Sequence, residues 1–119
     1  TSNSKHAELI GSMFHCADLL HIAHLKSKSY AEHVALGDAY DSIRDAADDI
    51  CELIQGYCGL LDIKIAESSY AEPIAYLKAE RTEYTSKLSE YSGMMDVQNK
   101  LQDLLAVFSK TIYKLENLK

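Results

Sequence analysis

The stretch SYAEHVALGDAYDSIRDAADDICELIQGY, residues 29–57, predicts a long amphipathic helix. It opens with Ser29 and Glu32 in the arrangement of a capping box, in which both side chains satisfy free N–H groups of the first turn. Apolar side chains then recur at three- and four-residue steps, at Tyr40, Ile43, Ala47, Ile50, Ile54 and Tyr57. Gly37 lies inside this helix at a cost of about 1 kcal/mol relative to alanine, so we expect a close helix contact there.

The same periodicity extends on both sides of this helix. It predicts further helices over residues 5–26, 73–92 and 94–118, with Pro73 in the first turn of the third helix and Gly93 before the fourth. We therefore expect one all-α domain over residues 1–119, built as a four-helix bundle. Between residues 59 and 72 the helical pattern is lost. An extended connection of about fourteen residues could reach roughly 45 Å, which is enough for a crossover between the second and third helices.

Composition and charge exclude several classes of protein. The formal net charge of −6 argues against DNA binding, which requires clustered Lys and Arg side chains. No apolar run approaches the roughly 18 residues of a membrane span, so no membrane association is expected. The cysteines Cys16, Cys51 and Cys58 have no CxxC spacing, and we interpret them as free thiols in a reducing compartment. The first residues lack the layout of a signal peptide, which favours a cytoplasmic location.

Three histidines and two carboxylates are candidate metal ligands. Asp48 and Glu52 are four residues apart, so their carboxylates project from one helix face and could bind a common cation. His33 precedes Asp48 by 15 residues, which is about 22 Å along a helix. Either His21 or His24, near the end of the first helix, could approach His33 across the interhelix loop. The chain then has two half-sites, and a homodimer with antiparallel second helices would complete two identical sites.

A family resemblance supports this interpretation. The pattern H-x11-H-x14-D-x3-E, met by His21, His33, Asp48 and Glu52, resembles the ferroxidase signature of Dps proteins, the starvation-induced mini-ferritins. SYAEHVALGDAYDSI is similar to the family's aromatic-x-x-H-x-x-F-x-x-x-Y-x-x-L run, DDICE to its D-x-x-A-E, and DLLAVFSKTIYKL to its last helix. The chain also resembles short, uncharacterised phage-encoded relatives of that family, for which the location would be the host cytoplasm.

The resemblance implies a ferritin-like four-helix bundle and a di-iron site at a dimer interface that oxidises Fe(II) to Fe(III). Iron is the implied metal, with another divalent metal as the alternative, and the implied assembly is a hollow cage. The family follows its first histidine with Trp-Asn, whereas His21 is followed by Ile-Ala and His24 by Leu-Lys, so both histidines remain candidates. Leu53 stands where the family has Arg, and a basic tail for DNA is missing.

The histidines also have simpler interpretations. His21 and His24 could be core histidines hydrogen-bonded to tyrosines. His33 could be a surface residue of the first turn. His6 and His15 have no matching partner in the pattern, and we expect both at the surface.

An acidic stripe continues the carboxylate pair toward the start of the same helix. Asp38, Asp41 and Asp45 follow one another at helical spacing, and we expect them on a solvated outer face. If this face holds no metal, the chain is a non-catalytic helical structural or interaction protein that retains the ferritin-like fold. The two interpretations differ in whether assembly responds to a chelator.

Overall fold

The computed structural model describes residues 3–118 and is helical with no strand in that range. Its helices are α1 (Asn3–Lys26), α2 (Tyr30–Cys58), α3 (Pro73–Lys87), the short 3-10 helix η1 (Leu88–Tyr91) and α4 (Met95–Asn117). The all-helical prediction is confirmed. The first, second and fourth helices begin and end within two residues of their predicted positions. The third predicted helix is divided, because its last turn tightens into η1. Between residues 3 and 118, none of the helices is long and apolar enough to cross a membrane.

Local side-chain chemistry sets where the helices begin and end. Ser29 caps α2 by accepting a hydrogen bond from the N–H of Glu32 at 3.3 Å. Glu72 caps α3 with its carboxylate, which accepts the N–H groups of Ile74 and Ala75, both at 2.9 Å. A negative charge at this position also interacts favourably with the helix dipole. Gly59 ends α2 with a φ of 81°, a backbone conformation that favours glycine.

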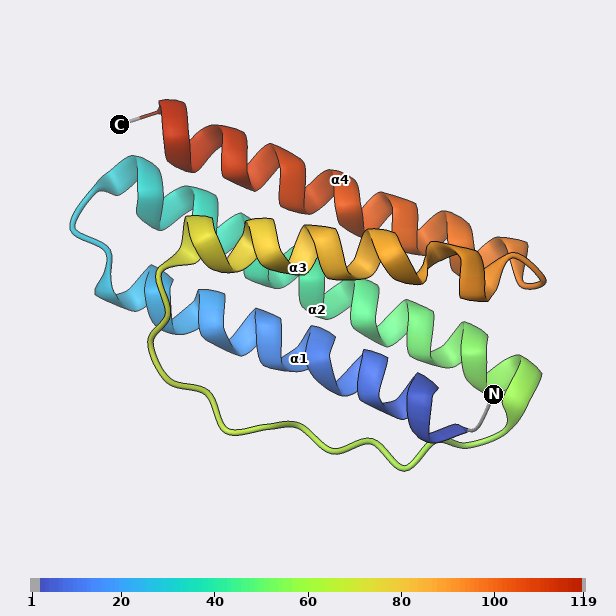
Figure 1. Ribbon diagram of the computed structural model, residues 1–119. Helices are drawn as coiled ribbons and strands as arrows, with labels where there is room; N and C mark the ends of the chain where they lie inside the picture. Colours follow the sequence, from blue (N-terminus) through green and yellow to red (C-terminus); the bar gives the residue numbers. More distant parts are fainter. Residues whose placement is uncertain (1–2, 119) are drawn as a thin grey trace.

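The four long helices pack as two antiparallel hairpins, α1 with α2 and α3 with α4 (Figure 1). The main contacts join α1 to α2 and α2 to α4, whereas α1 and α3 touch at few places. Figure 1 shows that α2 and α3 run in one direction, and α1 and α4 in the other. The largest fully buried side chains are Tyr84, Phe108, Ile10, Met13, Leu20, Leu36, Ile43, Ile50, Ile54, Leu77, Leu101 and Leu104. These side chains come from all four helices, so the bundle has one continuous core.

The connection between α2 and α3, residues 59–72, lies along α1 from one end to the other (Figure 1), and we call it the strap. At the start of α1, the side-chain amide of Asn3 donates a hydrogen bond to the carbonyl oxygen of Cys58 at 3.1 Å. At the end of α1, the Lys26 ammonium lies 5.8 Å from the ring centre of Tyr70. The strap therefore returns the chain to the end of the bundle where α2 began.

Two residues of α1 fix the strap between these ends. Gly11 is buried, and a Cβ there would collide with the carbonyl oxygen of Lys64. Four residues later, His15 Nδ1 lies 3.2 Å from the carbonyl oxygen of Ala66 and 3.1 Å from the hydroxyl of Ser68. The backbone of the strap can approach α1 this closely only because Gly11 has no side chain.

Two predictions from the sequence are wrong. His6, expected at the surface, is only 6% exposed and forms a hydrogen bond of 2.7 Å with the hydroxyl of Tyr91. The ring of Tyr91, itself buried, lies against His6, with centroids 5.4 Å apart. Tyr57, expected on the apolar stripe of α2, is 55% exposed, and its hydroxyl donates to Asp96 at 2.8 Å. Tyr57 lies in the last turn of α2, where its ring is largely in solvent and its hydroxyl meets the first turn of α4.

Candidate metal-binding half-sites

His24 and His33 meet where α1 ends and α2 begins. Their rings are stacked with centroids 3.7 Å apart and planes inclined by 18°. Nδ1 of His24 lies 2.6 Å from the carbonyl oxygen of His33, and Nδ1 of His33 lies 2.9 Å from the carbonyl oxygen of His24. A carbonyl can only accept a hydrogen bond, so each Nδ1 carries a proton. In the neutral form, Nε2 of each ring then carries the lone pair that a metal binds.

The turn between the helices explains this reciprocal arrangement. The carbonyl of His24 is one of the last four of α1, which have no partner within the helix. It accepts the N–H of Ser27 at 3.3 Å as well as the imidazole of His33. The hydroxyl of Ser27 in turn donates to the carbonyl of Ser29 at 3.0 Å and holds the turn closed. His33 therefore caps the C-terminus of α1 while its own position is fixed by the first turn of α2.

His21 lies beside this pair without joining it. Its ring stacks on Tyr40 at 4.1 Å between centroids and 9° between planes. The edge of the Tyr40 ring meets His24 at 5.4 Å, and the centroids of His21 and His24 are 6.1 Å apart. The structure thus places His24 against His33, and His21 against Tyr40. As a core histidine, His24 was expected to form a hydrogen bond with a tyrosine. Its Nδ1 is instead bonded to the backbone carbonyl of His33.

Asp48 and Glu52 form the second half-site on the exposed face of α2. The pKa of the Glu52 carboxyl is raised, first because it shares a hydrogen bond with the Asp48 carboxyl and then because of the negative charge of Asp48. The two carboxyl groups are therefore close enough to interact. A cation bound to both would relieve the repulsion between their negative charges. Asp38, Asp41 and Asp45 are exposed on the same helix, as expected from the sequence.

The two half-sites stay apart within one chain. They are separated along α2 by about 22 Å, given the rise of an α-helix. Within residues 3–118, no three His, Cys, Asp or Glu side chains of one chain are grouped so that they could hold a metal ion. A complete site made of these residues would therefore need a second chain. The donor set would then be two imidazoles and two carboxylates, which suits iron.

A polar cluster in the seam between α1 and α3 was not anticipated from the sequence. The hydroxyls of Ser12 and Tyr84 lie 2.6 Å apart, and the thiol of Cys16 forms a hydrogen bond with Tyr76. Burial raises the pKa of Cys16 to about 12, so this thiol stays protonated and unreactive. Burial also raises the pKa of the half-buried Glu80. The spacing of Tyr76, Glu80 and Tyr84 at four-residue steps is the sequence signal that indicates a shared face.

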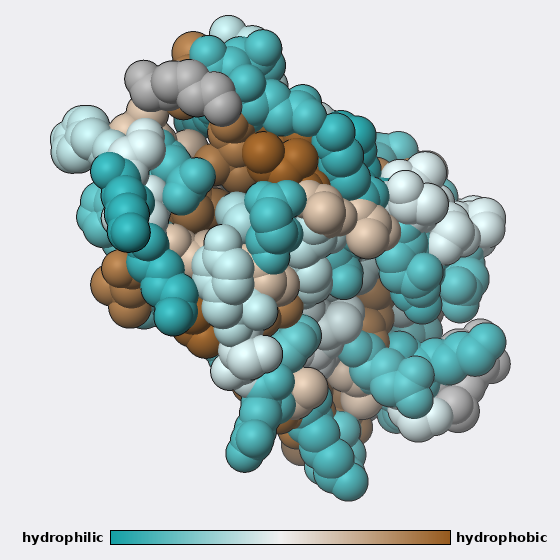
Figure 2. All heavy atoms as spheres, turned by 60° about the vertical axis from the view of Figure 1, so that its left-hand side comes forward, coloured by the Kyte–Doolittle hydropathy of each residue, from teal (hydrophilic) through white to brown (hydrophobic). Residues whose placement is uncertain are grey.

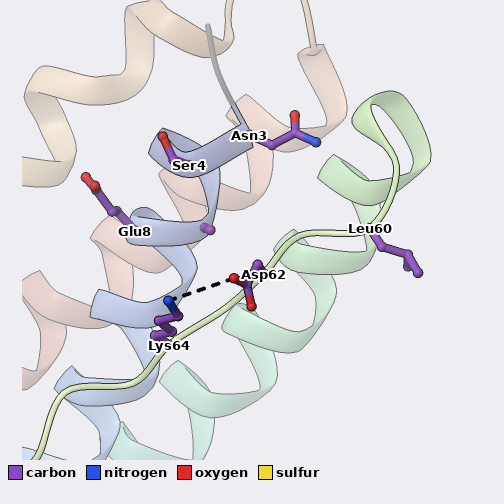
Figure 3. Close-up of a pocket in the computed structure, with 7 residues that line it drawn as sticks. Asn3, Ser4, Glu8, Leu60, Asp62 and Lys64 are labelled. Carbon is purple, nitrogen blue, oxygen red and sulfur yellow. Dashed lines mark ion pairs between the residues drawn. The ribbon is translucent and has the colours of Figure 1, made fainter.

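A surface pocket of about 410 Å³ lies between the first turns of α1 and the strap (Figure 3). Its lining residues are Asn3, Ser4, Ala7, Glu8, Leu60, Asp62 and Lys64. Figure 3 shows Lys64 and Asp62 turned toward one another, with 3.9 Å between their charged atoms, and Glu8 pointing away from both. Both side chains of this ion pair are highly exposed. The pocket contains none of the candidate metal ligands.

Residues 24–115 match a family of unknown function, DUF5856. The chain belongs to the DUF5856 family. No curated protein and no solved structure gives a significant match to it. The segment shared with the DUF5856 family contains His24, His33, Asp48 and Glu52, and it begins three residues after His21.

Proposed function

We propose that this DUF5856 protein is a ferritin-like protein that binds Fe(II) at a site shared between two subunits and oxidises it to Fe(III). His24 and His33 of one chain would bind the metal together with Asp48 and Glu52 of a second chain. The observation that carries the proposal is the fixed tautomer of the two stacked histidines. Metal-binding histidines typically donate their other N–H to a carbonyl or carboxylate, which orients the ring and raises its basicity.

The residues around the metal have separate tasks in this proposal. The backbone carbonyls of His33 and His24 accept the Nδ1–H groups and orient the imidazole rings, so that Nε2 of each neutral ring is the metal ligand. Asp48 and Glu52 would bind the cation with their carboxylates and balance its charge. Fe(II) is the substrate, and each ion gives one electron to dioxygen or peroxide. Carboxylates also stabilise the Fe(III) product, because hard oxygen ligands favour the more highly charged ion.

The path of the strap supports the ferritin-like topology. Because the strap runs the full length of α1, α3 starts at the same end of the bundle as α2 (Figure 1). A bundle in which every helix reversed direction would need only a short connection there. The resemblance of the sequence to Dps proteins predicts the same crossover.

The acidic stripe of Asp38, Asp41 and Asp45 should make assembly of the dimer depend on bound cations. In a dimer with antiparallel α2 helices centred between the half-sites, the exposed Asp38, Asp41 and Asp45 of both chains would lie near the two-fold axis. Like charges at short range repel, so cations that bind at the interface should favour the dimer. We expect a chelator to shift the protein toward monomers in sedimentation velocity.

The direct test is an anaerobic Fe(II) titration followed by addition of oxidant. Wild type should bind Fe(II) and oxidise it rapidly, whereas the Asp48→Ala/Glu52→Ala variant should lose both properties. The Asp103→Ala variant is the control, because it removes an exposed carboxylate of α4, outside both the pair and the acidic stripe. Equal Fe(II) binding by wild type and the double variant would refute the proposal.

A complementation experiment tests whether the site is shared. One chain carries His24→Ala/His33→Ala, and the other carries Asp48→Ala/Glu52→Ala. Each is expected to be inactive alone. In a refolded equimolar mixture, half of the dimers are mixed and each has one intact site, so about a quarter of wild-type activity should return. If the mixture stays as inactive as its components, the ligands do not come from two chains.

A second candidate function is a non-catalytic interaction protein. It is favoured by apolar side chains exposed where α1 and α2 meet, with Leu25 70% and Tyr30 83% exposed. Figure 2 brings this end of the bundle forward and shows apolar side chains between hydrophilic ones. Exposed apolar residues that gather on one face commonly mark contact surfaces. This candidate predicts that a chelator leaves the oligomer mass unchanged, and a strictly monomeric protein would exclude the shared metal site.

A further inference from the structure

Gly37 lies in the interior of α2, where glycine is among the poorest helix formers. The helix continues through it without interruption, so no turn or break accounts for the residue. A Cβ built at this position would lie 3.0 Å from Cε1, 3.2 Å from Nδ1 and 3.9 Å from Nε2 of His24. The first two distances are tighter than ordinary van der Waals contacts, so the His24 ring would have to shift by a few tenths of an ångström. The imidazole of His24 therefore occupies the space that any side chain at position 37 would need.

Three contacts hold the half-buried His24 ring in its position. Its Nδ1 is held 2.6 Å from the carbonyl oxygen of His33, and its face is stacked 3.7 Å from the His33 ring. The edge of Tyr40 meets it at 5.4 Å between centroids. A displacement of a few tenths of an ångström at Gly37 would therefore lengthen the hydrogen bond or open the stack.

We propose that Gly37 is a positioning residue of the metal half-site. Because it has no side chain, the His24 imidazole lies against α2 with its Nδ1–H on the His33 carbonyl and its Nε2 left for the metal. The metal part of this inference rests on the proposed function, whereas the contact between Gly37 and His24 does not. The inference also assigns His24, rather than His21, as the histidine of α1 that binds iron.

The same helix contains a matched control. A Cβ at Gly56 would meet nothing within 4 Å. Gly37→Ala and Gly56→Ala therefore make the same chemical change in one helix, and both remove the flexibility of a helical glycine. Only Gly37→Ala introduces a tight contact with a candidate ligand.

The first measurement is Fe(II) affinity under anaerobic conditions. Gly37→Ala should weaken Fe(II) binding about tenfold to hundredfold, the range found when the outer-shell support of a metal ligand is lost. Gly56→Ala should bind Fe(II) like wild type. Helix content from circular dichroism should be preserved in both variants. Wild-type affinity in Gly37→Ala would overturn the assignment of a positioning role.

The second measurement is a double-variant cycle that asks whether Gly37 acts through His24. In a His24→Ala background the ring is gone, so Gly37→Ala should cause no further loss of Fe(II) affinity. In that background it should also raise Tm by several degrees, as Gly56→Ala does in wild type. With His24 present, Gly37→Ala should raise Tm less or lower it. Equal Tm shifts in both backgrounds would overturn the inference.

The two measurements separate this inference from the proposed function. If wild type binds Fe(II) no better than Asp48→Ala/Glu52→Ala, the proposed function fails and no metal ligand remains to be positioned. The Tm cycle then decides alone whether Gly37 fixes the His24 ring. If wild type binds Fe(II) and Gly37→Ala matches it, the function stands and the positioning role fails.

Discussion

Acidification should weaken the contact between α1 and η1 through His6. This side chain is 6% exposed and is hydrogen-bonded to the hydroxyl of Tyr91 at 2.7 Å, with ring centroids 5.4 Å apart. Burial lowers the pKa of His6 below its ordinary value of 6.5, and the charge of Glu90 opposes this shift in part. The folded protein therefore keeps His6 neutral at a pH where the unfolded chain already binds a proton.

The sign and the limit of the effect follow from linkage. Where the unfolded state binds more protons, the free energy of unfolding rises with pH. The contribution of His6 is therefore complete above pH 6.5 and is lost as the pH falls below that value toward the lowered pKa. One group can change the free energy of unfolding by at most about 1.4 kcal/mol per pH unit.

Urea unfolding followed by circular dichroism, between about pH 7.5 and pH 5, measures this slope through the linkage relation. The His6→Gln variant keeps a side chain that can hydrogen-bond to Tyr91 but cannot be protonated. Relative to this variant, wild type should lose up to about 1.4 kcal/mol per pH unit below pH 6.5. His15→Gln is the control, since His15 is bonded to the strap and only half-buried. Parallel pH profiles for wild type and His6→Gln would refute the reasoning.

Three further predictions concern the strap, the carboxylate pair and the thiols. Gly11→Ala should destabilise the fold by about 1–3 kcal/mol in urea unfolding and speed proteolysis of the strap, because the new Cβ collides with its backbone; the stabilisation usual for Gly→Ala in a helix would contradict this. Asp48→Asn should lower the pKa of Glu52 in a carboxyl NMR titration, because the charge that raises it is gone; an unchanged pKa would mean that the carboxyls do not interact. Iodoacetamide should alkylate the half-buried Cys58 in the folded protein and Cys16 only after unfolding, since burial raises the pKa of Cys16 to about 12; equal labelling rates by mass spectrometry would refute the buried thiol.

The candidate site shows how far sequence patterns reach. Spacing along α2 correctly separates His33 from Asp48 and Glu52, because the rise of a helix is fixed by local hydrogen bonds. The same spacing leaves His21 and His24 equivalent, since both lie near the end of α1. Residues of α2 distinguish the two histidines. The backbone carbonyl of His33 binds Nδ1 of His24, and Gly37 leaves space for the His24 ring.

The error at His6 has a similar origin. His6 lies four residues before Ile10 and seven before Met13, on the buried stripe of α1, so a helical pattern was present. Its hydrogen-bond partner Tyr91 lies 85 residues further along the chain. Nothing in the sequence indicates that the hydroxyl of Tyr91 would form a hydrogen bond with the buried imidazole of His6.

The sequence by itself determined the four helices, the Ser29 cap of α2 and the spacing of residues along each helix, whereas the Glu72 cap of α3 was not predicted. These features depend on hydrogen bonds and side-chain directions within a few residues, and they can be predicted from local chemistry. Only the tertiary structure decided that the strap lies on Gly11, that His24 rather than His21 stacks on His33, and that His6 is buried. Each of these depends on backbone atoms or side chains from a distant part of the chain, whose position is set by the packing of the whole bundle.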